Sequence, residues 1–90
     1  MQLIYIVAKT EYYGEKMSDE SPLILGAYRN ASEAYKTALR YYEERVKFDY
    51  IASKEDLKDF EDMRRLEVFY KEIENYNNYY VLEIIITTLN

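Results

Sequence analysis

The chain has 90 residues, a net charge of −5, and neither cysteine nor histidine. Its length is that of one domain spanning residues 1–90. The missing cysteine excludes a disulfide framework and thiolate metal sites, and the missing histidine removes the commonest metal ligand and the best proton carrier near neutral pH. We therefore expect no metal and no cofactor. The acidic charge disfavours direct binding of long nucleic acids and favours a partner that is itself basic.

The first predicted element is a strand from Gln2 to Ala8, in which both faces are apolar. Such a strand is typical of a position that is buried on two sides or covered by a second subunit. The apolar start is short, has no basic leader and soon meets Lys9 and Glu11, so it predicts neither a signal peptide nor a membrane span. We expect a cytoplasmic protein without membrane contact. Residues 10–21 are polar and predict a long connection, too long for a tight hairpin turn.

A second strand is predicted from Leu23 to Tyr28, directly after Pro22, where the missing backbone N–H does least harm. It most simply pairs antiparallel with the first strand. Asn30 and Glu33 then form a capping-box-like helix start. The apolar side chains that follow share one arc of a helix, namely Ala31, Ala34, Tyr35, Ala38, Leu39, Tyr42 and Val46. This helix must lie on an apolar surface, which the predicted strands supply.

Residues 48–52 are a short apolar linker, which we expect to tuck under the sheet edge. Ser53 is the N-cap candidate of a second, more exposed helix from Lys54 to Arg65. Beyond Leu66 the apolar residues no longer follow the helical period, which favours a strand from Leu66 to Glu74. A single longer helix running on to about Glu74 is the alternative.

Residues 75–78 have the composition of a turn, and the last predicted strand runs from Tyr79 to Leu89. This strand is long, β-branched and carries one charge, so it should be central in the sheet or covered by a partner. Together the elements predict an α+β fold, with a four-stranded antiparallel sheet in the order ββααββ and two helices on one face. The two-sided apolar character of the first and last strands predicts a homodimer.

The second helix carries the one cluster of carboxylates worth testing as a site. Its candidate binding residues are Glu55, Asp56, Asp59 and Asp62. The simpler interpretation is a solvated helix face, and the calcium-loop pattern is missing. Alternatively, a spacing of roughly 5–6 Å between these carboxylates approaches that of phosphates along a strand, so the row could occupy a basic groove meant for nucleic acid.

Twelve tyrosines in so short a chain provide a second candidate surface. Tyrosine is a good strand and core residue, which is the simpler explanation for any one of them. Stacked tyrosines beside an arginine could also hold a base or a small nucleotide. The residues we select for such a tyrosine and cation surface are Tyr12, Tyr13, Tyr41, Arg45, Tyr76 and Tyr79.

Three segments follow one another as strand, strand end and helix start: Leu3-Ile-Tyr-Ile-Val7, Gly26-Ala-Tyr-Arg-Asn30 and Ala31-Ser-Glu-Ala34. In this arrangement, and in a composition rich in Tyr, Asn, Glu and Lys without His, Cys or Trp, the chain resembles small phage-encoded counter-defence proteins. The resemblance implies a viral protein in the host cytoplasm, either an anti-CRISPR-like inhibitor or a sponge for immune signalling nucleotides. It covers no diagnostic motif, so it assigns no functional residue.

Three functions are therefore weighed. The first is a non-enzymatic inhibitor that blocks a host defence or nucleic-acid-handling protein by occupying its basic surface. The second is a homo-oligomeric binder of a small nucleotide-like ligand. The third and least expected is an enzyme that uses carboxylates, tyrosine or lysine, because His, Cys and a phosphate-binding loop are all missing from the sequence.

Overall fold

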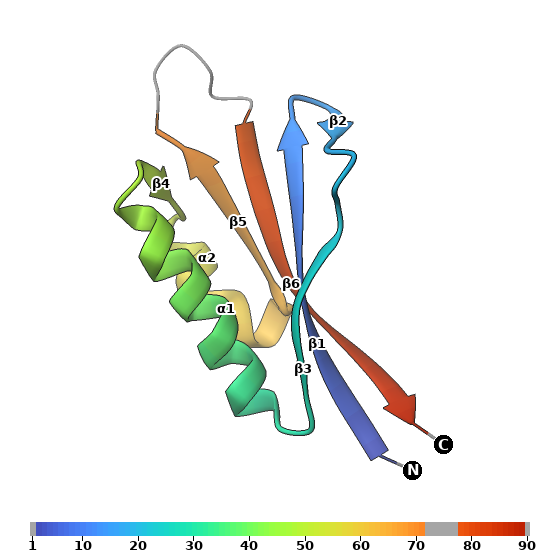
Figure 1. The fold of residues 1–90 in the computed structure, drawn as a ribbon. Coiled ribbons are helices and arrows are strands. Elements are labelled where there is room, and N and C mark those ends of the chain that lie inside the picture. The colour runs from blue at the N-terminus through green and yellow to red at the C-terminus, as the bar shows by residue number, and fades with distance from the viewer. Residues whose placement is uncertain (1, 72–77, 90) are drawn as a thin grey trace.

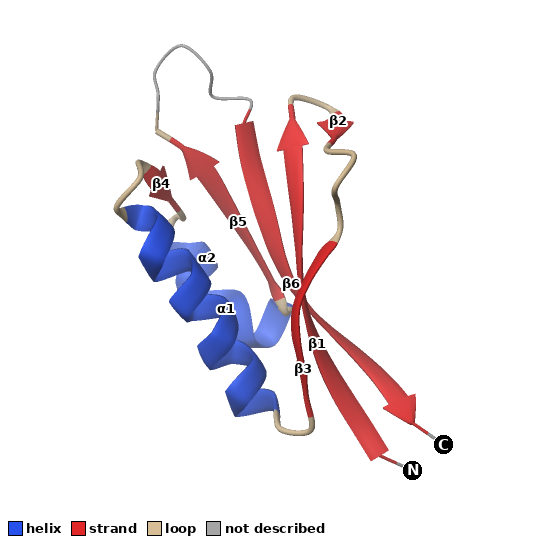
Figure 2. Cartoon of the chain, in the orientation of Figure 1, coloured by secondary structure: helices blue, strands red, loops and turns tan. Residues whose placement is uncertain are grey.

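The structure, a computed structural model, describes residues 2–71 and 78–89. It has the predicted α+β class, with two helices and an antiparallel sheet (Figures 1 and 2). In chain order the elements are β1 (Gln2–Tyr13), β2 (Lys16–Met17), β3 (Leu23–Tyr28), α1 (Ala31–Val46), β4 (Tyr50–Ile51), α2 (Lys54–Met63), β5 (Arg65–Tyr70) and β6 (Asn78–Leu89).

The prediction of four strands was wrong, because the described residues alone form a sheet of six strands. Its strand order is β2-β1-β6-β5-β4, with β3 also paired to β1. The first added strand arises because β1 runs on to Tyr13 and returns through a hairpin turn at Gly14, whose φ is +68°. The predicted loop over residues 10–21 is thus partly strand. The second added strand, β4, lies in the predicted apolar linker, where Phe48 is exposed instead of tucked under the sheet.

The two central strands are β1 and β6, which pair along twelve residues, from Gln2 opposite Leu89 to Tyr13 opposite Asn78. β3 pairs with the other edge of β1, and β5 pairs with the other edge of β6 as far as Glu83. The predicted antiparallel pairing of β1 with β3 and the central place of the last strand are therefore confirmed. Within the described residues, however, Ile85–Leu89 have β1 as their one paired neighbour.

Helix α1 has its predicted bounds, and the Asn30 side chain caps it by accepting hydrogen bonds from the backbone N–H groups of Ser32 (2.8 Å) and Glu33 (3.3 Å). Ala34, Ala38 and Tyr42 of the predicted apolar arc are buried, whereas Val46 in its last turn is exposed.

Helix α2 ends at Met63, two residues before its predicted end at Arg65. Arg64 adopts a left-handed conformation with a φ of 56°, and its N–H donates to the carbonyl oxygen of Phe60 (2.7 Å). The chain therefore turns directly into β5, which rules out the alternative of one long helix. The predicted strand from Leu66 is confirmed as far as Tyr70, and Lys71 lies beyond its end. Residues 72–74 of that prediction and most of the predicted turn at 75–78 lie outside the described residues.

One face of the sheet packs against both helices and forms the core. The buried cluster joins Val7, Leu66, Val68, Tyr80, Leu82 and Ile84 of the strands to side chains of both helices, including Ala38 and Phe60. Tyr35 links the helices, since its hydroxyl donates to the carbonyl oxygen of Glu61 (2.6 Å) and its ring meets the Phe60 ring edge-on at 5.1 Å. The prediction that both helices lie on one face is therefore confirmed. We call this side of the sheet the helix face, and the other the far face.

Neither α1 nor α2 is long and apolar enough to cross a membrane, and they are the helices of the described part of the chain.

Candidate functional site

A groove with an excess of negative charge lies between α2 and β5. It has a volume of about 270 Å³ and is lined by Asp56, Asp59, Met63, Arg65 and Glu67, which together we call the acidic groove. The three helical residues are spaced three and four apart, so they follow one side of α2. The sharp turn at Arg64 brings the start of β5 back beside the helix, and alternation along the strand puts Arg65 and Glu67 on the same face.

The acidic groove holds three carboxylates against one guanidinium group. That guanidinium is already shared, because Arg65 Nη2 lies 3.1 Å from Glu67 Oε1 and Arg65 Nη1 lies 4.0 Å from Glu83 Oε1. Asp56 and Asp59 form no ion pair with any residue in ranges 2–71 and 78–89. Beside them, Met63 exposes 69% of its surface. A lysine or arginine would fit such a groove, since its aliphatic stem can pack on Met63 while its charge meets the carboxylates.

The structure divides the predicted acidic set into two pairs. Asp56 and Asp59 line the acidic groove, whereas Glu55 and Asp62 are exposed on α2 and do not line it. Arg65 and Glu67 were not predicted as site residues from the sequence, because their place in the groove depends on how closely β5 lies beside α2. Among the residues that the structure describes, no group of three or more acidic side chains is arranged to hold a metal ion.

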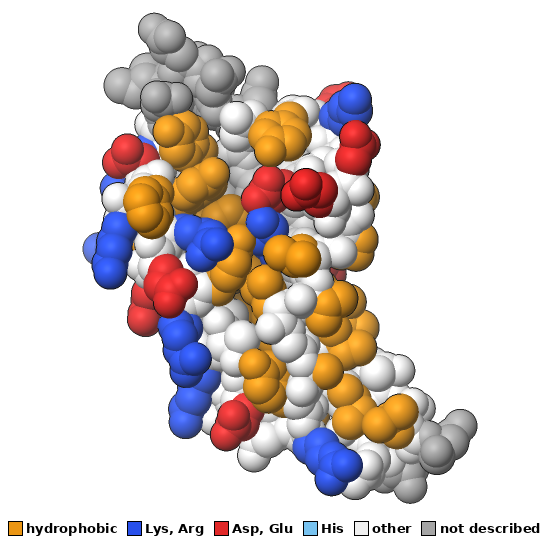
Figure 3. Space-filling model, viewed as in Figure 1, with side chains coloured by type: hydrophobic (Ala, Val, Ile, Leu, Met, Phe, Trp, Pro, Cys, Tyr) orange, Lys and Arg blue, Asp and Glu red, His pale blue; other side chains and the backbone are white. Residues whose placement is uncertain are grey.

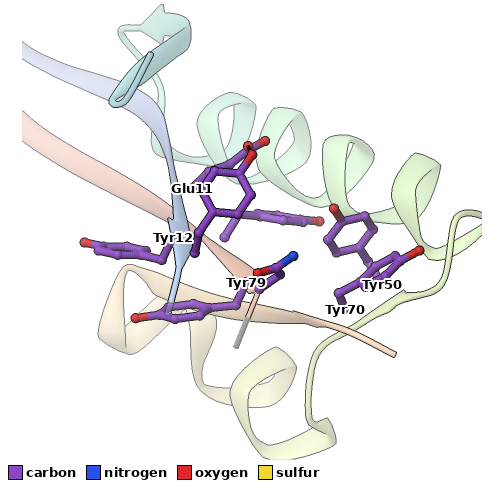
Figure 4. A pocket seen from close by; sticks show the side chains of 8 residues that line it. Glu11, Tyr12, Tyr50, Tyr70 and Tyr79 are labelled. Carbon is purple, nitrogen blue, oxygen red and sulfur yellow. Dashed lines mark hydrogen bonds between the residues drawn. The ribbon is translucent and has the colours of Figure 1, made fainter. Parts of the chain in front are cut away.

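A second site lies at the end of the sheet that carries β2 and β4. It is a cleft of about 210 Å³ lined by Glu11, Tyr12, Tyr13, Tyr50, Tyr70, Asn78, Tyr79 and Tyr80, which together we call the tyrosine cleft (Figure 4). Register explains how four strands contribute to it. Tyr50 of β4 is opposite Tyr70 of β5, and Tyr13 of β1 is opposite Asn78 of β6.

The tyrosines lie on two sides of the sheet. Tyr12 and Tyr79 stack with ring centroids 4.8 Å apart and belong to the far face, where Phe69 stacks on Tyr79 at 5.3 Å. Figure 4 shows these two rings side by side, pointing away from Tyr50 and Tyr70. Tyr50 instead contacts the rings of Tyr70 (5.1 Å) and the core residue Tyr80 (5.3 Å). Because side chains alternate along a strand, Tyr13 and Glu11 share the helix face with Tyr80.

Charges of both signs meet beside the tyrosine cleft. Glu11 pairs with Lys9 through Oε1 and accepts a hydrogen bond from the Tyr13 hydroxyl through Oε2 (3.2 Å). The hydrogen bond from Lys9 is the main cause that lowers the pKa of Glu11. Burial alone would lower the pKa of Lys9, but its contacts with Glu11 and Tyr41 outweigh burial and raise it. Both groups therefore stay charged over the ordinary pH range.

Arg45 adds a second cation at this end of α1. Its guanidinium carbon lies 3.4 Å from the centre of the Tyr41 ring, a cation–π contact, and Lys9 Nζ lies 5.6 Å from the same ring. The Tyr41 ring in turn meets Tyr80 edge-on at 5.7 Å. Figure 3 shows Lys and Arg side chains beside acidic and hydrophobic ones over the upper part of this face.

Tyr80 is the most unusual member of the tyrosine cleft. The residue is 2% exposed, and its hydroxyl has no hydrogen-bond partner among the described residues. Burial raises the pKa of Tyr80 strongly, so the phenol stays neutral. Tyr42, also buried, differs because its hydroxyl accepts the backbone N–H of Ala52 at 3.3 Å. An unpaired buried hydroxyl is costly, which makes Tyr80 a candidate contact for a bound group.

The predicted tyrosine and cation residues are brought together only in part. Tyr12, Tyr13 and Tyr79 all line the tyrosine cleft, but the rings of Tyr12 and Tyr79 stack on the far face. Tyr41 flanks the cleft through its contact with Tyr80, and Arg45 through its contact with Tyr41. Tyr76 lies outside the described residues. Five further lining residues were not predicted, because they come from four strands whose register the sequence does not specify. They are Glu11, Tyr50, Tyr70, Asn78 and Tyr80.

No family model matches this chain, and neither the curated proteins nor the solved structures contain one that is significantly similar to it.

Proposed function

We propose that this chain is a non-enzymatic binding protein that occupies a basic surface of a protein partner through its acidic groove. The observation that carries the proposal is the imbalance in that groove, where three carboxylates face one guanidinium that is already shared with Glu83. A cationic side chain from a partner would restore the balance. Glu55 and Asp62, exposed on the same helix, extend the negative potential and would speed the approach of a basic surface.

The partner we propose is a host protein that handles nucleic acid or serves in defence, because such proteins carry basic grooves for phosphates. Carboxylates spaced along α2 would fill the positions of those phosphates and block the groove. The resemblance to small phage-encoded inhibitors agrees with this mode of action.

We propose that the protein acts by occupying the surface of its partner and not by catalysing a reaction. The sequence has no histidine or cysteine. The pKa of Glu11 is lowered and the pKa of Tyr80 is raised, so both move away from neutrality, where a general acid or base works best.

We also propose that the chain acts as a homodimer, paired through the edge of β6 from Ile85 to Leu89. This edge is uncharged and β-branched, and Ile85, Ile86 and Leu89 are exposed on it. An open edge of this kind is a site for strand addition, and two identical uncharged edges can pair antiparallel about a two-fold axis. Light scattering should give the mass of two chains. Ile85→Lys should reduce it to one, whereas Ile51→Lys, at an equally exposed site on β4 (46% against 44%), should not.

The acidic groove is tested with a fluorescent nona-arginine peptide as the probe of a basic surface. Asp59→Lys should weaken binding about tenfold at low salt, because it replaces attraction by repulsion at the groove. Glu43→Lys makes the same charge change on the exposed side of α1 and should weaken binding by less than about twofold. Equal losses in the two variants would show that net charge alone attracts the peptide, and the proposal would fail.

A further inference from the structure

We infer that the tyrosine cleft is a second binding site, which takes one mononucleotide: a planar, hydrogen-bonding ring that carries an anionic group. The site is separate from the acidic groove, so the inference does not depend on the proposed protein partner. It rests on the size of the tyrosine cleft, on its unpaired polar groups and on the charges at its flank.

Size and lining favour a single ring system. The volume of about 210 Å³ is below the roughly 300 Å³ at which pockets for drug-sized ligands begin. Tyr13, Tyr50 and Tyr70 provide aromatic surfaces, and base–aromatic stacking tolerates every base because each has a π-face.

Three polar groups are available to orient the ring. Asn78 offers an amide donor and an acceptor, and the Glu11 carboxylate has lone pairs beyond those used by Lys9 and Tyr13. The hydroxyl of Tyr80 is buried without a hydrogen-bond partner in residues 2–71 and 78–89, so a ring nitrogen or exocyclic group that reached it would satisfy it. Such a set favours a ring with donors and acceptors on its edge over a purely apolar one.

The charges favour an anion and disfavour a cation. Tyrosines around a carboxylate could in principle hold an ammonium or guanidinium group. Here, however, Lys9 already neutralises Glu11. Arg45, which stacks on Tyr41 next to Tyr80, has one long ion pair, at 3.9 Å to the exposed carboxylate of Glu44, among the described residues. A phosphate on a bound base would compete for the Arg45 guanidinium at the flank of the cleft, whereas a cationic ligand would be repelled by it. The net charge of −5 still opposes a long strand, so one nucleotide is the occupant that fits.

The test is a titration of the intact protein with AMP, GMP and UMP, followed by calorimetry and by native mass spectrometry. We expect saturable binding of one nucleotide per chain by at least one of them. Tyr70→Ala should weaken it about tenfold through lost stacking. The neighbouring Phe69→Ala, whose ring is on the far face, should change it by less than about twofold.

The anionic group is tested separately with Arg45→Gln. This variant should lower the affinity for the monophosphate about fivefold and leave that of the matching nucleoside unchanged. If Tyr70→Ala fails to fold, two other variants test the inference. Tyr70→Phe keeps the ring and should keep nucleotide binding, and Arg45→Gln should lower the affinity for the monophosphate.

Three outcomes would overturn the inference: no saturation by any of the three nucleotides up to about 10 mM, equal losses in Tyr70→Ala and Phe69→Ala, or binding of the nona-arginine peptide that Tyr70→Ala abolishes. The last would assign the tyrosine cleft to a cation. Asp59→Lys should not affect nucleotide binding, so failure of this inference and failure of the proposed function are distinguishable.

Discussion

The acidic groove and the tyrosine cleft are built in different ways. The groove joins one helix to one strand, its carboxylates have one sign in excess, and its apolar member Met63 is exposed. The cleft gathers side chains from four strands, holds charges of both signs at its flank, and includes Tyr80 from the buried core. Side chains of the groove can therefore change without loss of the fold, whereas the cleft is partly a continuation of the core.

The largest expected contrast is in stability. Tyr80→Ala should lower the free energy of unfolding by about 3–5 kcal/mol, because it empties a buried aromatic position. Met63→Ala, at an exposed lining residue of the acidic groove, should change it by no more than about 0.5 kcal/mol. Urea unfolding followed by circular dichroism measures both. A loss at Met63 as large as that at Tyr80 would mean that the groove is part of the core after all.

A smaller difference in the free energy of unfolding is expected between two variants that each remove a buried tyrosine hydroxyl. Tyr42→Phe should cost about 1–3 kcal/mol, because it leaves the buried N–H of Ala52 without its acceptor. Tyr80→Phe removes a hydroxyl that has no partner in the described chain, so the free energy of unfolding should stay the same or rise. The same urea experiment decides. If Tyr80→Phe were the more destabilising variant, its hydroxyl would have a partner and would not be available to a ligand.

The smallest expected effect is the change with pH in the stability that Glu11 contributes to the folded chain. The pKa of Glu11 in the folded chain lies below the ordinary value of 4.5. The contribution of Glu11 to the free energy of unfolding is therefore present above pH 4.5 and is lost as the pH falls through the pKa of the folded chain. The pair with Lys9 is partly exposed, so this contribution should be less than about 1 kcal/mol. The stability difference between wild type and Glu11→Gln should be steady from pH 6 to pH 8 and should disappear as the pH falls below 4.5 and through the lowered pKa of the folded chain. A difference that persists in acid would refute a role for the ion pair.

Local patterns in the sequence predicted the elements that local chemistry controls. The Asn30 cap, the bounds of α1 and β3, and the start of α2 after Ser53 all follow from side-chain to backbone hydrogen bonds or from apolar periodicity. The strands β2 and β4 have two residues each, too few to show a period, and they form because longer strands are already in place beside them.

The two sites were predictable only in part, because each combines residues from elements that are brought together by the fold and not by local sequence. The spacing of Asp56 and Asp59 follows from helical geometry, but their neighbours Arg65 and Glu67 depend on the left-handed turn at Arg64. The tyrosine cleft depends on the register of β1, β4, β5 and β6, and a shift of one residue would send each of its side chains to the other face.

Native mass spectrometry of the tagged chain, captured gently from the cells in which it acts, tests most directly whether it binds a basic protein through the acidic groove. We predict a complex whose added mass is that of a protein, and we predict that Asp59→Lys, captured in parallel, lacks it. A wild-type ion that contains only copies of this chain would contradict the proposed function.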